Sequence, residues 1–135
     1  MRAIIIDDER LARKELKSLL KEYHEIEIID ECASPEEALK SIEKHNPDLL
    51  FLDIQMPEKT GFDLLQELDK SPKVVFVTAF DEYAVKAFEV NALDYLMKPV
   101  DPERLKETMA KLLSEDIEDE ELYDVPDRGI LSSND

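Results

Sequence analysis

Apolar residues along the first 113 positions form two kinds of pattern, short continuous runs and longer segments with helical spacing. The short runs are rich in Ile, Val, Leu and Phe, which favours β-strands over helices of the same length. A fifth, less apolar run follows near the end of this region. We therefore expect strands at residues 3–6, 26–29, 49–52, 74–77 and 94–97.

The segments between these strands carry apolar residues three and four positions apart, the spacing of an amphipathic helix. The second segment begins with Ser34 and Pro35, a typical helix start, and Asn46-Pro47 is expected to end it. We expect helices over residues 12–23, 35–45, 61–70 and 83–88, and a fifth from residue 102 onward.

The runs at 49–52 and 74–77 are apolar at every position, as in parallel strands covered on both faces. Five alternating strand and helix units suit right-handed crossovers in one sheet. We therefore predict an α/β fold: a doubly wound five-stranded parallel sheet in the flavodoxin-like order 2-1-3-4-5, with helices on both faces.

Acidic residues follow two of the predicted strands, Asp7 and Asp8 after the first and Asp53 after the third. In the predicted order these strand ends flank the switch point of the sheet, where ligands bind. Two carboxylates ~4 Å apart repel by ~4 kcal/mol at an effective dielectric constant near 20, so three need a cation or raised pKa values. Lys98, after the fifth strand, supplies one charge, and oxygen ligands without His or Cys favour Mg²⁺.

Composition narrows the possible partners. The 135 residues suit one domain, and 17 basic against 34 acidic residues give a net charge of -17. This charge disfavours direct binding to nucleic acid or to an anionic membrane. Cys32 is the lone cysteine, and neither a membrane span nor a signal segment is evident, so we expect a cytoplasmic protein.

Residues 114–135 contain nine acidic residues and one arginine, so we divide the chain into a domain at 1–113 and an acidic linker or tail at 114–135.

Four short motifs at the ends of strands one, three, four and five together resemble the receiver domain of two-component response regulators. The resemblance covers roughly residues 2–113, and its motifs are specific in combination. They are Ile-Asp-Asp at 6–8, Leu-Asp-Ile-Gln-Met-Pro at 52–57 followed by Gly61, Val-Thr-Ala at 77–79 and Tyr-Leu-Met-Lys-Pro at 95–99.

For the metal site, this resemblance implies that Asp53 is the phosphoacceptor and that Asp8, Asp53 and the backbone carbonyl of Gln55 bind Mg²⁺. Asp7 would act through a metal-bound water. Lys98 would pair with the phosphoryl oxygens, and the peptide bond before Pro99 would be cis.

For signalling, the resemblance implies that Thr78 moves towards the phosphoryl group while Tyr95 turns inward. This would change the face made by the fourth helix, fifth strand and fifth helix. A sensor histidine kinase would donate the phosphoryl group, and phosphorylation would promote a homodimer. The domain would be a switch that catalyses its own phosphorylation and dephosphorylation, not a turnover enzyme. Gln55 and Phe80 would tune hydrolysis, with Phe80 slowing it.

Residues 78–99 also resemble receivers joined to LytTR-type DNA-binding domains, so we expect a fragment of a transcriptional regulator, with a free-standing receiver as the alternative. Three further readings stay open. A metal-dependent phosphohydrolase would usually carry a second acid where Gln55 stands. A flavodoxin-like FMN carrier would need a phosphate loop after the first strand, and the chain has two glycines. A pseudo-receiver would bind partners without phosphorylation.

Overall fold

The computed structural model describes the backbone of residues 1–124 and the side chains of residues 1–114. Its elements alternate strand and helix throughout. The strands are β1 (Arg2–Ile6), β2 (Glu27–Cys32), β3 (Leu49–Leu52), β4 (Lys73–Thr78) and β5 (Asp94–Met97). The helices are α1 (Arg10–Leu20), α2 (Pro35–His45), α3 (Gly61–Gln66), α4 (Ala84–Glu89) and α5 (Pro102–Asp124).

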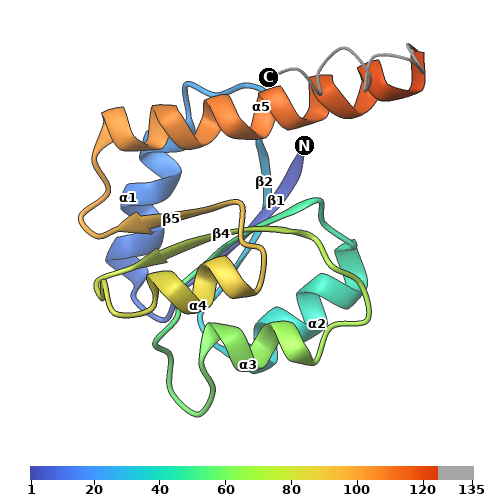
Figure 1. The fold of residues 1–135 in the computed structure, drawn as a ribbon. Helices are drawn as coiled ribbons and strands as arrows, with labels where there is room; N and C mark the ends of the chain where they lie inside the picture. The colour runs from blue at the N-terminus through green and yellow to red at the C-terminus, as the bar shows by residue number, and fades with distance from the viewer. Residues whose placement is uncertain (125–135) are drawn as a thin grey trace.

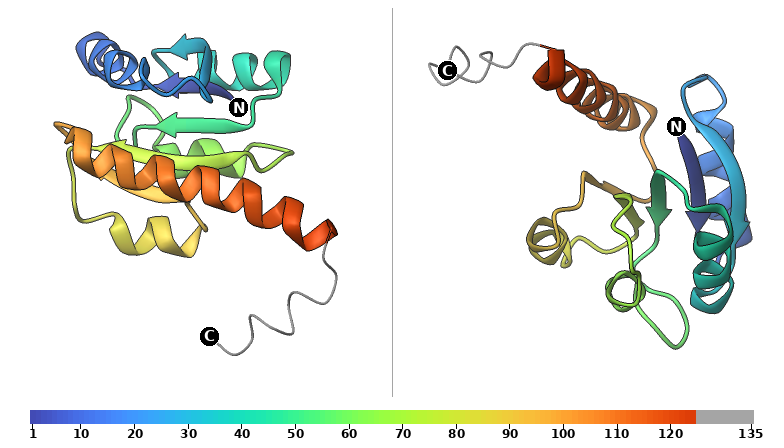
Figure 2. Two further views of the ribbon diagram at one scale, coloured as in Figure 1. Left: turned by 90° about the horizontal axis from the view of Figure 1, so that it is seen from above. Right: turned by 90° about the vertical axis from the view of Figure 1, so that its right-hand side faces the viewer.

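All strand pairs in the sheet are parallel, and the strand order is β2-β1-β3-β4-β5. The predicted fold class is therefore confirmed. Figure 1 shows α1 and α5 on one side of the sheet and α2, α3 and α4 on the other, so that both faces are covered. Figure 2 shows the same arrangement from two further sides, with α5 lying across the strands.

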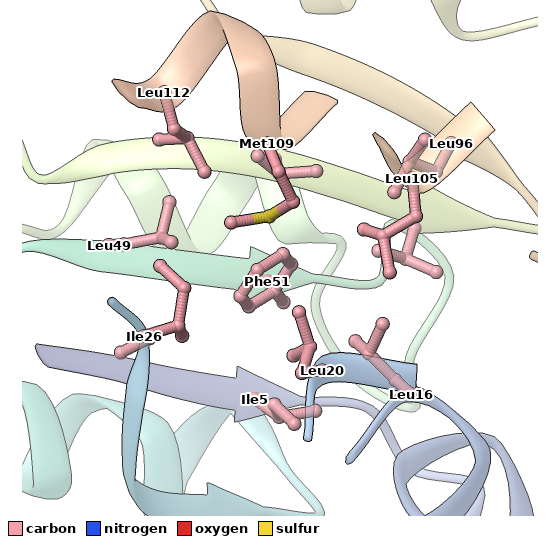
Figure 3. Packing of buried hydrophobic residues seen from close by; sticks show 13 residues of the cluster. Ile5, Leu16, Leu20, Ile26, Leu49, Phe51, Leu96, Leu105, Met109 and Leu112 are labelled. Atoms are coloured by element: carbon pink, nitrogen blue, oxygen red, sulfur yellow. The ribbon is translucent and has the colours of Figure 1, made fainter. Parts of the chain in front are cut away.

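Alternation along the strands divides the buried side chains into two clusters, one on each face of the sheet. On one face, Leu16 and Leu20 of α1 and Leu105 and Met109 of α5 pack around Phe51 of β3. Figure 3 shows these side chains converging on the Phe51 ring from both helices. This packing supports the sheet beneath the C-terminal ends of its strands, which Asp7, Asp8 and Asp53 follow.

Several element ends differ from the sequence prediction. The third helix ends at Gln66 because the amides of Glu67 and Leu68 bond to carbonyls three residues back, which tightens the chain into a turn. The fourth helix begins at Ala84, with Tyr83 as its N-cap. The second strand continues to Cys32 as an edge strand, where partial burial hides the apolar pattern.

The second helix follows its sequence signals closely. The Ser34 hydroxyl accepts a hydrogen bond from the amide of Glu37, Pro35 occupies the first turn, and Asn46 ends the helix in a left-handed conformation with φ 49°. The predicted boundary at residue 113 lies within α5, and residues 125–135 of the predicted tail lie outside the described residues. The division at 113 remains a prediction.

Candidate functional site

The backbone brings the ends of β1 and β3 side by side. Ile6 pairs with Leu52 in register, so that Asp7 and Asp53 leave the sheet at the same edge. The amide of Asp53 donates to the carbonyl of Ile6 at 2.9 Å, which extends the pairing by one residue. The shared edge beyond these strand ends, called the crevice below, is therefore set by the parallel pairing of the backbone.

Three carboxylates meet in this crevice. One oxygen from each of Asp7, Asp8 and Asp53 lies within 4.8 Å of the others, a spacing that fits a shared metal ion. Asp7 and Asp53 are only 4% and 5% exposed, whereas Asp8 is exposed. The structure thus brings together the acidic residues that the sequence predicted for one site.

Lys98 lies against the same cluster. Its Nζ is 2.7 Å from Asp7 Oδ2, 3.3 Å from Asp53 Oδ2 and 3.2 Å from Glu9 Oε1. Its amide donates to the carbonyl of Thr78 at 2.8 Å, and its peptide bond to Pro99 is cis, as expected. One ammonium group therefore faces three carboxylates and leaves the cluster negative.

This imbalance appears in the acidity of Asp53. Burial, followed by the charge of Asp7, raises the pKa of Asp53 from 3.8 to about 6, although Lys98 and the Ile54 amide act in the opposite direction. Burial alone would lower the pKa of Lys98, but its hydrogen bond to Asp7 and the charges of Asp53 and Asp7 raise it instead. Burial and the charge of Asp7 therefore outweigh the attraction of Lys98 and make the carboxylate form of Asp53 less favourable than in water.

Gly61 allows the loop after Asp53 to close tightly. A Cβ built at Gly61 would lie 2.5 Å from the backbone carbonyl oxygen of Asp53, closer than any real contact of that kind. The Gly61 amide also donates to the carbonyl of Ile54 at 2.8 Å. A side chain at position 61 would therefore displace the backbone that holds Asp53.

The two predicted switch residues meet at the loop after β4. Thr78 is fully buried, and its Oγ1 accepts a hydrogen bond from the amide of Phe80 at 3.4 Å. The Tyr95 hydroxyl donates to the carbonyl of Phe80, and the Tyr95 ring lies 6.5 Å from that of Phe76. Thr78 and Tyr95 are thus linked through one residue of this loop.

Two contacts at the site escaped the sequence analysis. Glu9, the N-cap of α1, reaches Lys98 from the residue after the paired aspartates, and its acidic side chain directly after Asp7 and Asp8 could have suggested it. The side-chain amide of Gln55 donates to the Tyr83 hydroxyl at 2.8 Å, which no local pattern predicts because the residues are 28 positions apart. The first contact adds a carboxylate beside Lys98, and the second joins the loop after Asp53 to the residue before α4.

Together these residues can hold a hard divalent cation and present a carboxylate to an electrophile. The donor set consists of oxygens alone, and Lys98 supplies a fixed positive charge at the same edge. A parallel sheet of this order defines a doubly wound α/β domain, and the carboxylates at its switch point form a ligand-binding site lined by acidic residues.

The family model described as "Response regulator receiver domain" matches residues 3–110, and the chain belongs to this family. Receiver domains of this family are phosphoacceptor signalling domains of two-component systems. Receiver domains interact with histidine kinases and bind Mg²⁺ at an acidic pocket. Membership in this family replaces the FMN-carrier reading.

The chain is 55% identical over 113 residues to an uncharacterized response regulatory protein of Vibrio cholerae, covering 82% of this chain and 48% of the relative. It is 49% identical over 117 residues to the transcriptional regulatory protein BtsR of Escherichia coli, covering 85% and 49%. The response regulatory domain of mrkE from Klebsiella pneumoniae superposes with a TM-score of 0.77 at 35% identity, covering 85% of this chain and 97% of that one.

The chain therefore spans about half the length of the curated relatives it matches. Within the described part of the chain, no helix is long and apolar enough to cross a membrane.

Proposed function

We propose that Asp53 accepts a phosphoryl group from a phosphohistidine of a sensor histidine kinase in the cytoplasm. The observation that carries this proposal is the meeting of Asp7, Asp8 and Asp53 within 4.8 Å, with Lys98 3.3 Å from Asp53. The Asp53 oxygen attacks phosphorus, the bond from phosphorus to the histidine nitrogen breaks, and the imidazole leaves with the electron pair.

The residues present fit Mg²⁺ as the cation of this site. Asp8, Asp53 and the backbone carbonyl of Gln55 would hold the ion, and Asp7 would hold it through a water. When bound, Mg²⁺ supplies positive charge that neutralises the carboxylates and the phosphoryl oxygens. The raised pKa of Asp53 supports this assignment, because burial and the charge of Asp7 outweigh Lys98 at this carboxylate and a cation would offset them.

Lys98 and Thr78 would stabilise the phosphoryl group from the chain's own side chains. Lys98 would transfer its contact from Asp53 to the phosphoryl oxygens, since its Nζ already lies between Asp7 and Asp53. Thr78, buried at the end of β4, would donate its hydroxyl once it turns from Phe80 towards the crevice. This movement would loosen the loop that Tyr95 also holds, and the signal would leave through it.

The output face would comprise α4, β5 and α5. Val85, Phe88 and Met97 are 72%, 83% and 39% exposed on these elements, which favours a surface that another molecule covers. We infer a phosphorylation-promoted homodimer through this face. The direct target would be another protein surface and not nucleic acid, because the net charge is -17.

The domain would control a DNA-binding effector, of the LytTR type, in transcription. Support comes from the name of the Escherichia coli relative, a transcriptional regulatory protein, and from relatives about twice as long as this chain. A free-standing receiver is the alternative.

Incubation with Mg²⁺ and acetyl phosphate, followed by intact mass measurement, tests the proposal. The wild-type protein should gain the mass of one phosphoryl group, and Asp53→Asn should gain none while remaining folded. Asp69→Asn is the matched control, since Asp69 is an exposed aspartate between α3 and β4. Labelling that persists in Asp53→Asn, or a folded wild type that stays unlabelled, would overturn the assignment.

A further inference from the structure

A hydrogen bond joins the loop after the phosphoacceptor to the start of α4. Gln55 lies two residues after Asp53, and its Nε2 donates to the Tyr83 hydroxyl at 2.8 Å. Tyr83 is the N-cap of α4, although its side chain makes no capping bond to that helix. The contact therefore spans the gap between the β3–α3 loop and α4.

The position of the Tyr83 hydroxyl is fixed by aromatic packing. Its ring lies 6.0 Å from Phe62 of α3 and meets Phe80 edge-on at 6.2 Å. Lys86 of α4 lies over the Phe62 ring, 4.8 Å from its centroid. Because the ring is held from two elements, its hydroxyl presents a directed partner to Gln55 and not a mobile one.

A glutamine carboxamide near a phosphoryl group is chemically significant because it can orient an attacking water. In this chain the Gln55 amide nitrogen already has a partner on the far side of the loop. A side chain held in this way has its amide donor engaged by Tyr83 and is less free to turn to a water beside phosphorus. Its contribution to hydrolysis is then limited by how often the hydrogen bond opens.

We propose that Tyr83 is a positioning residue that occupies the Gln55 carboxamide, keeps it from orienting the attacking water and so prolongs the life of the acyl phosphate on Asp53. The inference rests on the proposed function of Asp53. In the step that it slows, a water oxygen bonds to phosphorus and the bond from phosphorus to the Asp53 oxygen breaks. Asp53 leaves with the electron pair, inorganic phosphate is released, and the proton of the water passes to solvent.

The test compares first-order decay of the phosphorylated protein in the wild type and in Tyr83→Phe, which keeps the ring and removes only the hydroxyl. Loss of one hydrogen bond should accelerate decay by roughly 2- to 10-fold. The gain should vanish when Gln55→Met is added, so that Gln55→Met and the double variant decay at the same rate. Tyr23→Phe is the control, because Tyr23 packs against the core cluster on the other face of the sheet.

The hydrogen bond itself is tested without metal or phosphate. The side-chain amide resonances of Gln55 should shift in Tyr83→Phe and stay in place in Tyr23→Phe. An unshifted Gln55 resonance, or faster decay that survives in the Gln55→Met background, would overturn the inference. A wild type that takes no label refutes the proposed function and with it the effect on lifetime, while the resonance still decides whether the hydrogen bond exists.

Discussion

Two buried aspartates, Asp53 after β3 and Asp94 at the start of β5, have opposite electrostatic surroundings. Both are nearly inaccessible, at 5% and 8% exposure. For Asp94, burial alone would raise the pKa, but hydrogen bonds from Arg104 and Thr108 outweigh it and lower the pKa well below the usual range. For Asp53, burial and the charge of Asp7 prevail, and the pKa rises to about 6.

The contrast arises from the partners. Arg104 binds both oxygens of Asp94, at 2.6 and 2.9 Å, and the Thr108 hydroxyl donates at 2.6 Å, so that α5 is tied to the start of β5. Asp53 shares one lysine with Asp7 and Glu9. A fully paired carboxylate stabilises the fold, whereas an underpaired one is available for a cation and a phosphoryl group.

Removal of the Asp94 partner should have the largest effect on stability. Arg104→Met leaves a buried carboxylate with Thr108 and with Lys111, whose Nζ is 3.4 Å away. We expect the free energy of unfolding, measured by urea denaturation at pH 7, to fall by about 2 to 4 kcal/mol. Lys40→Met is the control, because its ion pair with Glu36 is exposed and should contribute less than about 0.5 kcal/mol. Equal losses in the two variants would remove the contrast between Asp94 and a surface pair.

Neutralising Asp53 should raise the free energy of unfolding, whereas removal of the Asp94 partner lowers it. Because the folded pKa of about 6 lies above the ordinary 3.8, the stability contributed by Asp53 is complete below about pH 4 and is lost as pH rises through about 6. Asparagine does not titrate. Asp53→Asn should therefore stabilise the Mg²⁺-free protein by about 1 to 3 kcal/mol at pH 8, as measured by urea denaturation.

The advantage of Asp53→Asn should shrink as the pH falls towards 4. An equal advantage at both ends of this range, or a less stable variant at pH 8, would show that the crevice already compensates the Asp53 charge.

The sequence was sufficient to predict the sheet order and the gathering of Asp7, Asp8 and Asp53, because parallel pairing brings the ends of β1 and β3 to one edge. The continuous apolar run of β3 was the most informative pattern, because a strand that is covered on both faces carries apolar residues at every position. Four short motifs at strand ends predicted the family, which the match to the receiver-domain model confirms.

The partners of Asp94 and Gln55 were beyond reach of the sequence. Arg104 lies ten residues after Asp94, across a turn whose geometry no periodicity specifies, and Tyr83 lies 28 residues after Gln55 and meets it through the packing of different elements. Side-chain pairing between elements depends on rotamers and element ends, and those ends moved by several residues at α3 and β2. Whether a carboxylate is paired therefore emerges only in the folded structure.

Binding of Mg²⁺ should change the free energy of unfolding less than the two substitutions above, and the change should depend on the carboxylates around Asp53 and not on Asp94. An ion that binds only the folded state raises the free energy of unfolding by about 1.4 kcal/mol when present at about ten times its dissociation constant. We expect this increase at pH 8 in the wild type and in Asp69→Asn, and its loss in Asp8→Asn, which removes one carboxylate of the cluster. Thermal or urea unfolding with and without Mg²⁺ measures it. An undiminished increase in Asp8→Asn would place the ion elsewhere.

The smallest expected effect concerns rate and not stability. Phe80 follows Thr78 by two residues and is 38% exposed, and its ring has no group that can orient water. A carboxylate there could hold an attacking water, so Phe80→Glu should shorten the life of the acyl phosphate a few-fold, equivalent to about 1 kcal/mol or less.

Decay of the labelled protein measures this effect, and Leu11→Glu makes the same exchange at an exposed apolar residue of α1. Stability should change by less than about 0.5 kcal/mol in Leu11→Glu and by at most about 1.5 kcal/mol in Phe80→Glu, which also loses the ring contact with Tyr83. Equal lifetimes in Phe80→Glu and wild type would show that Phe80 does not limit hydrolysis. A faster decay in Phe80→Glu but not in Leu11→Glu would instead show that the surroundings of Asp53 can be tuned without loss of the pairing that fastens α5 to β5.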